Sequence, residues 1–381
     1  MKQSIALTAA WLLAATLNLH AQGSLTPPPG APAPVMKTLD EVQPRTPVTQ
    51  LTCPGNANTV HIISAPGSYY LTANISTETL ADGISISASN VTLDLNGFSI
   101  TRLTGTGGNA INIGGNKGIR ILNGMIVGGT TQTSGVFTLA GWTHGISSSQ
   151  PTSAIVHISD LIVRGVRSRG IFVGWTNGNL VERCLVDTCG EIGITCSFVT
   201  DTVVRNSFDD GINAGNGTSN AVVKDCFAEC VGNGFGIYGP LADISNSRGI
   251  AVSSSGISAG NATNCTGISS ISIGFVCAGN ANNCTGKSTS GLTAADGLTV
   301  TGNASNCLGT SAGSGIGLSA LNATNSSGTS VSGSFGMSIS GTASFCRGAR
   351  SGGVAISAPI AIGCTSGGGT ITSAQKHLGT P

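Results

Sequence analysis

Short runs in which apolar and polar residues alternate recur along most of this chain. The recurring phrase is a glycine, an aliphatic residue, a polar residue and a second apolar residue, as in Gly83-Ile84-Ser85-Ile86. Twelve copies open at Gly83, Gly145, Gly170, Gly193, Gly211, Gly236, Gly256, Gly274, Gly297, Gly315, Gly336 and Gly353. Because Gly, Asn and Asp bound these short alternating runs, the pattern predicts β-strands joined by turns.

The phrase is periodic, and a second phrase keeps step with it. From Gly145 to Gly353 there are ten intervals over 208 residues, a mean period of 20.8. The second phrase, Asn-Ala-x-Asn-Cys-x-Gly, begins at Asn261, Asn280 and Asn303. A leucine-rich repeat of similar length would carry many leucines and a helical segment, which these phrases lack. The chain is therefore predicted to be all-β, a single-stranded right-handed parallel β-helix of about twelve coils.

This fold accounts for the composition. Three strands per coil, each stacked ~4.8 Å above its equivalent, would place Ile, Val and Leu in ladders along the interior. Asn at fixed corners can hydrogen-bond along the stack and adopts the left-handed conformation that tight turns need. Equal charges at equivalent positions would repel each other at that spacing, and only 9% of the residues are charged, against an ordinary ~25%.

The chain divides into five predicted segments. Residues 1–23 are expected to be a secretory signal peptide, because a short basic start precedes an apolar stretch. Residues 24–34 form a Pro-rich linker, 35–60 an N-terminal cap, 61–365 the β-helix and 366–381 a C-terminal tail or cap. Caps are expected because an uncovered end coil exposes a sheet edge. The predicted location is secreted, either extracellular or periplasmic.

Charge limits the class of partner. Seventeen Lys and Arg against sixteen Asp and Glu give a net charge of +1, whereas a nucleic-acid partner normally demands a basic face. After the N-terminal segment no apolar run approaches the ~18 residues of a spanning helix, so no transmembrane segment is expected in the mature chain. Seventeen charges lie between His144 and Arg248. Residues 251–364 carry only Lys287, Asp296, Arg347 and Arg350, so chemistry is expected in the central coils.

Segments near the start of the predicted helix resemble a known family. The run from Asn90 to Ile100, NVTLDLNGFSI, follows Gly67–Thr72 and precedes Gly118–Gly124. These segments are similar to the opening coils of bacterial secreted right-handed parallel β-helix repeat proteins in the pectin-lyase-like superfamily. The resemblance covers roughly residues 60–365. It implies the fold and no single activity, because the superfamily contains lyases, hydrolases, epimerases and adhesins.

Two adjacent aspartates are the candidate catalytic residues. Asp209 and Asp210, in the segment FDDG at 208–211, resemble the paired aspartates of polygalacturonase-type hydrolases, where one carboxylate is the general acid and another activates water. The other motifs of that family, Asn-Thr-Asp, Gly-His-Gly and Arg-Ile-Lys, have no match here. Position 210 also precedes the recurring glycine, as Asp82 and Asp296 do, so the alternative is a structural corner aspartate.

A lyase acting on acidic sugars would use basic residues to remove a proton and neutralise a carboxylate, with Ca²⁺ as its cofactor. Apart from that case no cofactor and no metal site are predicted. Basic residues on successive coils suggest a cationic stripe of Arg164, Arg167, Arg169, Arg183, Arg205 and Lys224. The candidate substrate-binding residues, in which aromatic rings flank cations, are Trp142, His144, Arg167, Arg169, Trp175 and Lys224. The alternative is a solvated flank with scattered aromatic residues.

Two functions of different classes follow. The first is a non-catalytic exported protein that binds a polysaccharide or cell-surface glycan, or serves as an extracellular scaffold. The second is a polysaccharide lyase or glycoside hydrolase that acts on acidic glycans at the flank of the central coils. The missing catalytic motifs favour the first.

Twelve cysteines in an exported chain raise the question of disulfides. One position of the repeat holds Cys265, Cys284, Cys307, Cys346 and Cys364, with Ser326 in one copy. Stacked thiols point in parallel and a serine can replace them, which favours buried free thiols at this position. The better candidates for bridges are Cys189, Cys196, Cys230 and Cys277.

Overall fold

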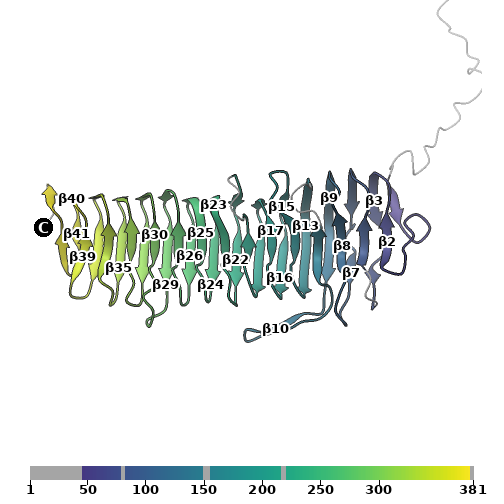
Figure 1. The fold of residues 1–381 in the computed structure, drawn as a ribbon, viewed down its shortest axis with the longest axis horizontal. Coiled ribbons are helices and arrows are strands. Elements are labelled where there is room, and N and C mark those ends of the chain that lie inside the picture. The colour runs from purple at the N-terminus through teal and green to yellow at the C-terminus, as the bar shows by residue number, and fades with distance from the viewer. Residues whose placement is uncertain (1–44, 79–81, 149–154, 216–219, 378–381) are drawn as a thin grey trace, which may run out of the picture. The chain divides into compact units, whose positions relative to one another are not determined.

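Strands are the only regular elements in the part of the chain that the structure describes. This computed structural model describes residues 45–78, 82–148, 155–215 and 220–377. The predicted signal peptide, the linker and residues 35–44 of the predicted cap lie outside these ranges. Of the 43 described strands, 41 join one continuous sheet whose pairings are parallel. Figure 1 shows these strands stacked side by side, which confirms the predicted all-β parallel β-helix.

Three ladders of parallel strands form the walls, and we call them ladders A, B and C in chain order. Ladder A contains β2 (Thr59–Ile63), β5 (Asp82–Ile86), β8 (Asn109–Gly114), β12 (His144–Ser148), β14 (Ile171–Gly174), β17 (Ile194–Cys196), β20 (Ile212–Asn213), β23 (Ile237–Ser245), β25 (Ile257–Thr263), β27 (Phe275–Cys277), β30 (Leu298–Val300), β33 (Leu318–Ala320), β36 (Phe335–Ile339), β39 (Val354–Ser357) and β42 (Thr370–Thr372).

Ladders B and C complete each coil. Ladder B contains β1 (Thr46–Val48), β3 (Gly67–Leu71), β6 (Val91–Asp94), β9 (Ile119–Val127), β13 (Val156–Val166), β15 (Leu180–Glu182), β18 (Phe198–Thr200), β21 (Val222–Lys224), the second halves of β23 and β25, β28 (Ala281–Asn282), β31 (Asn303–Ser305), β34 (Asn322–Thr324), β37 (Thr342–Ser344), β40 (Ile360–Ile362) and β43 (Gln375–His377). Ladder C contains β4 (Ile75–Ser76), β7 (Ser99–Thr101), the second halves of β9 and β13, β16 (Leu185–Cys189), β19 (Val203–Ser207), β22 (Phe227–Cys230), β24 (Arg248–Ala251), β26 (Thr266–Ser269), β29 (Thr285–Ser288), β32 (Leu308–Ser311), β35 (Ser327–Ser330), β38 (Arg347–Arg350) and β41 (Thr365–Ser366).

The described chain forms about fifteen coils, since ladder A has fifteen strands, so the predicted count of about twelve is too low. The pattern missed three coils. Val60 and Ala110 occupy the position of Gly83 on their coils, and β42 reads Thr-Ile-Thr. We number the coils by their ladder A strands, so that coils 4 to 8 contain β12, β14, β17, β20 and β23. The ladders also enter both segments expected to cap the helix, because β1 pairs with β3 and β43 with β40.

Aliphatic columns line the interior, as the alternation predicts. In ladder A a fully buried isoleucine recurs on successive coils, at Ile84, Ile111, Ile146, Ile171, Ile194, Ile212, Ile237 and Ile257, each 0% exposed. Burying each such side chain contributes about 1.5–3 kcal/mol. The preceding glycine is needed because the next coil passes close to it: a Cβ at Gly170 would lie 2.6 Å from the carbonyl oxygen of Gly193.

A left-handed residue turns the chain from ladder B to ladder C on nearly every coil. With φ between 46° and 60°, these residues are Asn96, Asn123, Asp160, Arg183, Asp201, Asp225, Asn246, Asn264, Asn283, Asn306, Asn325 and Phe345. Asn and Asp tolerate this conformation better than other side chains. The carboxamides also link the coils, because Nδ2 of Asn264 donates to Oδ1 of Asn246 at 3.0 Å and Nδ2 of Asn283 donates to Oδ1 of Asn264 at 2.8 Å. The predicted corner role of Asn is confirmed.

The residue after this corner explains the column of cysteines. Its side chain donates to the carbonyl oxygen two residues earlier: the distance is 3.2 Å from Sγ of Cys284 to Asn282 and 2.8 Å from Oγ of Ser326 to Thr324. Ser can therefore replace Cys, because both supply a short donor to the same carbonyl group. All twelve cysteines lie within the described ranges and are free and buried.

The prediction of bridges among the four other cysteines is wrong, and the register explains why. Cys189 and Cys230 share a column, but Ser207 stands between them. Two rungs of ~4.8 Å exceed the ~7 Å that a disulfide can span between Cα atoms. Cys196 lies in β17 and Cys277 in β27, with four rungs of ladder A between those strands.

The corner ladder predicts a specific pattern of stability changes. Asn264→Ala should lower the free energy of unfolding by about 2 kcal/mol, because it places Ala in the left-handed region and removes two inter-coil hydrogen bonds. Asn264→Gly should cost about half as much, since Gly tolerates that backbone. Asn282→Ala, on an exposed strand position, is the matched control. Urea unfolding measures all three, and equal effects at positions 264 and 282 would contradict the corner role.

The free thiols give a second prediction. Protein purified without reductant and unfolded in guanidinium should titrate close to twelve thiols, and far fewer while folded, because all of them are buried. Reductant should leave the thermal midpoint unchanged. A count in denaturant that falls short by a multiple of two, restored by reductant, would show that bridges exist.

Candidate functional site

A strip of aromatic and polar side chains lies on the outer face of ladder A over coils 4 to 8. Two positions of the repeat point outward there, the residue before the glycine and the residue after the buried isoleucine. The ladder A strip consists of seven residues at these positions and of Trp175, which directly follows β14; its members are His144, Arg169, Phe172, Trp175, Asp210, Asn213, Phe235 and Tyr238. Their contacts form two groups, one around Phe172 and the other around Asn213.

At the coil 4 end an arginine stacks on an aromatic ring. The guanidinium carbon of Arg169 lies 4.4 Å from the ring centroid of Phe172, and its Nε lies 3.8 Å from Oε2 of Glu191. The imidazole of His144 lies 6.2 Å from the Phe172 ring, and its Nδ1 accepts a hydrogen bond from the backbone N–H of Arg169 at 3.3 Å. Burial, and then the charge of Arg169, lower the pKa of His144, while Glu191 opposes this shift. His144 is therefore a neutral acceptor at pH 7.

At the coil 7 end a chain of hydrogen bonds fixes a tryptophan. Nε1 of Trp175 donates to Oδ1 of Asn213 at 3.1 Å, and Nδ2 of Asn213 donates to Oδ2 of Asp210 at 2.7 Å. Because Asn213 lies two coils beyond Trp175, the indole spans the intervening coil. The rings of Phe235 and Tyr238 lie 4.8 Å apart beside this network. The strip thus presents four aromatic rings held in defined positions.

Asp210 has the geometry of a structural corner residue. Oδ1 of Asp210, Asp82 and Asp296 accepts a backbone N–H from the next coil at 2.9, 2.7 and 2.8 Å, respectively. Oδ2 of the same three residues accepts a side-chain hydrogen bond within ladder A at 2.7, 2.9 and 3.2 Å. Oδ1 of Asp210 therefore links adjacent coils, as Oδ1 does in two aspartates outside the strip, while its Oδ2 is held by Asn213 of the same coil.

The environment of Asp210 also favours its protonated form. Burial raises the pKa of this carboxyl group to about 6, the hydrogen bond from the backbone of Phe235 opposes the shift, and the charge of Asp209 adds to it. Because the charged form of Asp210 is less stable in the folded protein than in water, this shift makes the stability of the fold depend on pH.

The structure brings together only some of the predicted site residues. His144, Arg169, Trp175 and Asp210 share the ladder A strip. Trp142 is fully buried, with its ring 5.7 Å from the guanidinium of Arg102, so it presents no face to a ligand. Lys224 lies on ladder B, 3.6 Å from Asp225. Arg167 and Asp209 lie at the turn from ladder C to ladder A, at the edge of the strip.

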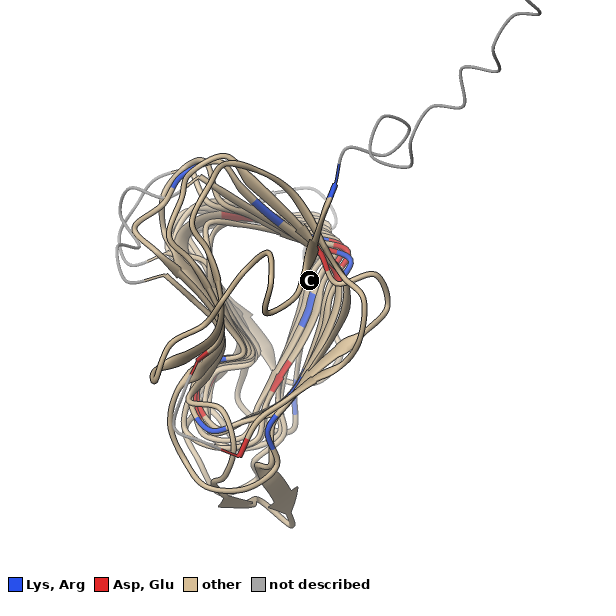
Figure 2. Ribbon diagram, turned by 90° about the vertical axis from the view of Figure 1, so that its right-hand side faces the viewer, with Lys and Arg blue, Asp and Glu red and all other residues tan. Residues whose placement is uncertain are grey.

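The predicted cationic stripe is not formed, because acidic residues lie between and beside the basic ones. Arg164 and Arg205 face outward from ladder C with Asp187 between them. Arg183 donates to both oxygens of Asp160, at 2.8 and 3.0 Å. The end-on view in Figure 2 shows basic residues beside acidic ones instead of a wall of one sign.

Sequence analysis missed four members of the strip: Phe172, Asn213, Phe235 and Tyr238. A signal was present, because Phe172, Asn213 and Tyr238 occupy the outward polar position of the repeat, where most coils have Ser or Thr. An aromatic residue at that position cannot point into the core without a change of register. Phe235 comes directly before a recurring glycine, as His144 does.

A hairpin stands at the edge of the strip. β10 (Thr131–Thr133) and β11 (Val136–Thr138) form the antiparallel pair that projects from the stack in Figure 1. The ring of Phe137 lies 5.7 Å from that of Phe208 in an edge-to-face arrangement. The hairpin therefore contacts the turn between ladders C and A at Phe208.

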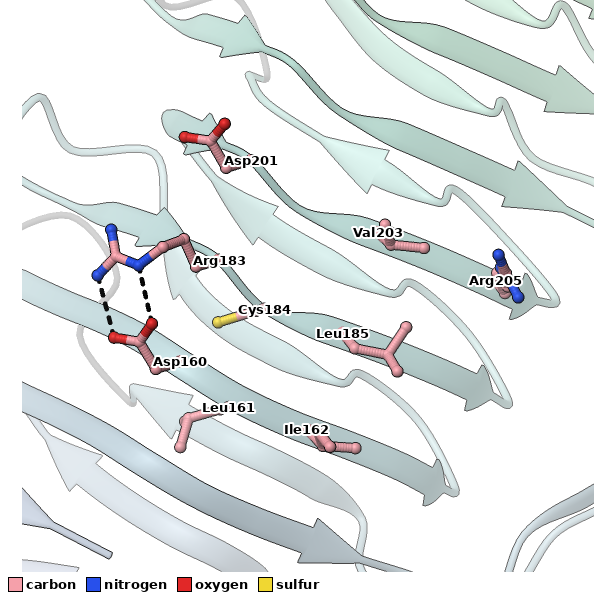
Figure 3. A pocket seen from close by; sticks show the side chains of 9 residues that line it. All are labelled: Asp160, Leu161, Ile162, Arg183, Cys184, Leu185, Asp201, Val203 and Arg205. Carbon is pink, nitrogen blue, oxygen red and sulfur yellow. Dashed lines mark hydrogen bonds and ion pairs between the residues drawn. The ribbon is translucent and has the colours of Figure 1, made fainter. Parts of the chain in front are cut away.

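A shallow groove of about 590 Å³ lies on a different wall, where ladder B turns into ladder C (Figure 3). It is lined by Asp160, Leu161, Ile162, Arg183, Cys184, Leu185, Asp201, Val203 and Arg205. The charged pair of Asp160 and Arg183 closes one side. Burial raises the pKa of Cys184 to about 12, so this thiol is no nucleophile at neutral pH.

Within the described ranges no three His, Cys, Asp or Glu side chains are placed to hold a metal ion together. No helix long and apolar enough to cross a membrane is present in that same part of the chain.

Comparison with protein-family profiles and with curated proteins gives no match. Among solved structures, the chain is similar to full-length tailspike protein 2 of the Escherichia coli O157:H7 bacteriophage CAB120, with 14% identity and a TM-score of 0.31. The similarity covers 87% of this chain and 40% of the tailspike. The fold assignment rests on the strand register of this chain itself.

The raised pKa of Asp210 predicts a pH dependence of stability. The pKa of Asp210 is about 6 in the folded protein, against a reference value of 3.8. Between these two pH values the folded protein therefore binds more protons than the unfolded chain. The free energy of unfolding should therefore fall as pH rises from about 4 to about 6, by on the order of 3 kcal/mol from this group. Asp210→Asn should flatten this slope, measured by urea unfolding across that range. An unchanged slope in the variant would contradict the assignment.

Proposed function

We propose that this protein is a secreted, non-catalytic parallel β-helix protein that binds a polysaccharide or cell-surface glycan along the ladder A strip. The observation that carries the proposal is the grouping of four aromatic rings, a stacked guanidinium and an amide on one outer face. The predicted signal peptide at residues 1–23 supports export, and the resemblance to the pectin-lyase-like superfamily supports a glycan as the ligand class.

The chemistry of the strip suits sugars. Aromatic rings offer apolar faces to the C–H faces of sugar rings, and their rigid side chains lose little entropy on binding. Arg169 and Asn213 supply donors for hydroxyl and carboxylate groups. Neutral His144, whose Nδ1 accepts the backbone N–H of Arg169, supplies its Nε2–H as a further donor. Coils 4 to 8 span four rungs, or ~19 Å, so the strip fits an extended chain of sugars better than a single monosaccharide.

The hydrogen bonds of Asp210 favour binding over catalysis. A glycoside hydrolase needs one carboxyl group free to donate a proton and another free to activate water or attack. Both oxygens of Asp210 are occupied. Oδ1 accepts the coil-to-coil hydrogen bond that Asp82 and Asp296 also accept, and Oδ2 accepts from Asn213 of the same coil. The alternative, a lyase or hydrolase acting on acidic glycans at this flank with Ca²⁺ in the lyase case, remains as an outcome of the test.

Glycan binding can be tested on a panel of polyuronates and neutral polysaccharides, with and without calcium. For the glycan that binds, Trp175→Ala and Tyr238→Ala should each weaken affinity about 10-fold or more, because each removes a stacking face of ~1–3 kcal/mol by analogy with base stacking. Phe345→Ala is the matched control, since Phe345 is an exposed aromatic side chain outside the strip. Equal losses in all three variants would contradict a specific strip.

The same incubations distinguish the alternative. Unsaturated products absorbing in the ultraviolet, or new reducing ends, would show turnover, and their loss in Asp209→Ala or Arg169→Ala would establish an enzyme. We expect no turnover.

A further inference from the structure

The outer face of ladder C carries a column of apolar side chains that point away from the core. They lie on β9, β13, β16, β19 and β22, at equivalent positions, and are Met125, Ile162, Leu185, Val203 and Phe227. Ile162 and Leu185 are 36% and 37% exposed. Figure 3 shows Ile162, Leu185 and Val203 in a row along the groove. A continuous apolar row on a solvent face marks an interaction surface.

A second column on the same face is charged and alternates in sign. Arg164, Asp187, Arg205 and Glu229 follow one another on coils 4 to 7, two residues along the strand from the apolar column. A β-bulge in β19 sets Glu229 opposite both Arg205 and Asn206, and the guanidinium carbon of Arg205 lies 5.8 Å from the ring centroid of Phe227. In the described ranges none of the four makes an ion pair within 4.0 Å. Asp187 accepts from Nδ2 of Asn206 at 2.8 Å through Oδ1. Four charges without ion-pair partners therefore flank an apolar row.

From this arrangement we infer that the ladder C face binds a second copy of the same chain, antiparallel to the first. Consider a two-fold axis parallel to the strands and midway between coils 5 and 6. It sets coil 5 opposite coil 6 and coil 4 opposite coil 7. The charged column of one copy then lies against the same column of the second copy in reverse order, so that opposite charges meet. Asp187 faces Arg205 of the second copy, and Arg164 faces its Glu229. Each contact occurs twice, as in an isologous interface.

Four members of the apolar column meet one another about the same axis, and the fifth, Met125, meets Arg248, the residue that continues this column on coil 8. Leu185 faces Val203 of the second copy, and Ile162 faces its Phe227. One coil farther out, the charged column ends in Val127 on one side and Ile250 on the other, and these two also meet. The alternative two-fold axis, along the helix, would instead set the charged column against the apolar one. Charge therefore selects the antiparallel arrangement.

The corner beside this face is compatible with the pairing. Arg183 of one copy faces Asp201 of the other. Asp160 and Asp225, which face each other, are neutralised within their own copy by Arg183 at 2.8 Å and Lys224 at 3.6 Å.

The available area suits a reversible dimer. In this register coils 1 to 10 of the two copies overlap, a footprint of roughly 45 by 15 Å per copy from strand spacing. That is close to the ~800 Å² per partner of a standard interface. The surface is separate from the ladder A strip, so this inference does not rest on glycan binding.

Sedimentation equilibrium of the wild-type chain over a range of concentrations tests the inference. A monomer–dimer equilibrium is expected. Asp187→Arg should weaken dimerisation about 10-fold or more, because Arg then faces Arg205 of the second copy. The double variant Asp187→Arg with Arg205→Asp should restore it, since the two charges still meet their opposites. Thr329→Arg, in the same outward column five coils beyond Glu229 and outside the overlapping coils, is the control and should have no effect.

Several results would overturn the inference. A wild-type chain that stays monomeric at all concentrations would do so without any variant. The contact would lie elsewhere if the Asp187→Arg variant, shown by circular dichroism to be folded, still dimerised like the wild type. The same would hold if the double variant failed to restore dimerisation. Leu185→Asn adds a check on the apolar column, because it should weaken the dimer while leaving the charges intact.

Discussion

Every residue in the coils has an equivalent ~4.8 Å above and below it, and this stacking constrains the rest of the structure. A side chain that fits once must fit beside copies of itself. Isoleucines do so by burial, and asparagines do so by linking carboxamides, as Asn264 does with Asn246 and Asn283. Like charges do not, which explains the low charge of the chain and the alternating signs of Arg164, Asp187 and Arg205.

The same constraint separates structural from functional residues. Asp210 resembles a catalytic carboxylate in sequence, yet its Oδ1 accepts the same hydrogen bond from the next coil as Oδ1 of Asp82 and of Asp296 does. Phe172 and Tyr238 stand where most coils have Ser or Thr. Residues that depart from the repeat at outward positions are therefore the better indicators of a ligand than residues that match it.

The two outer faces described here differ in chemistry and in partner. The ladder A strip combines stacked aromatic rings with hydrogen-bonding groups whose orientation is fixed, as a ligand site requires. The ladder C face combines an apolar row with charges lacking ion-pair partners, an arrangement that suits a protein surface of reversed charge order. A solenoid can present both, because its walls turn away from each other while sharing one core.

Periodicity in the sequence determined the fold class, the buried isoleucines and the corner role of Asn, because each recurs every coil and is decided by local geometry. It undercounted the coils where Val60 and Ala110 replace glycine, and it placed Trp142 on the surface although its ring is fully buried. Only the tertiary structure decided which outward residues meet. Trp175 and Asn213 are 38 residues apart and touch because the indole crosses a whole coil. The lengths of the intervening turns set that contact, and no repeat encodes them.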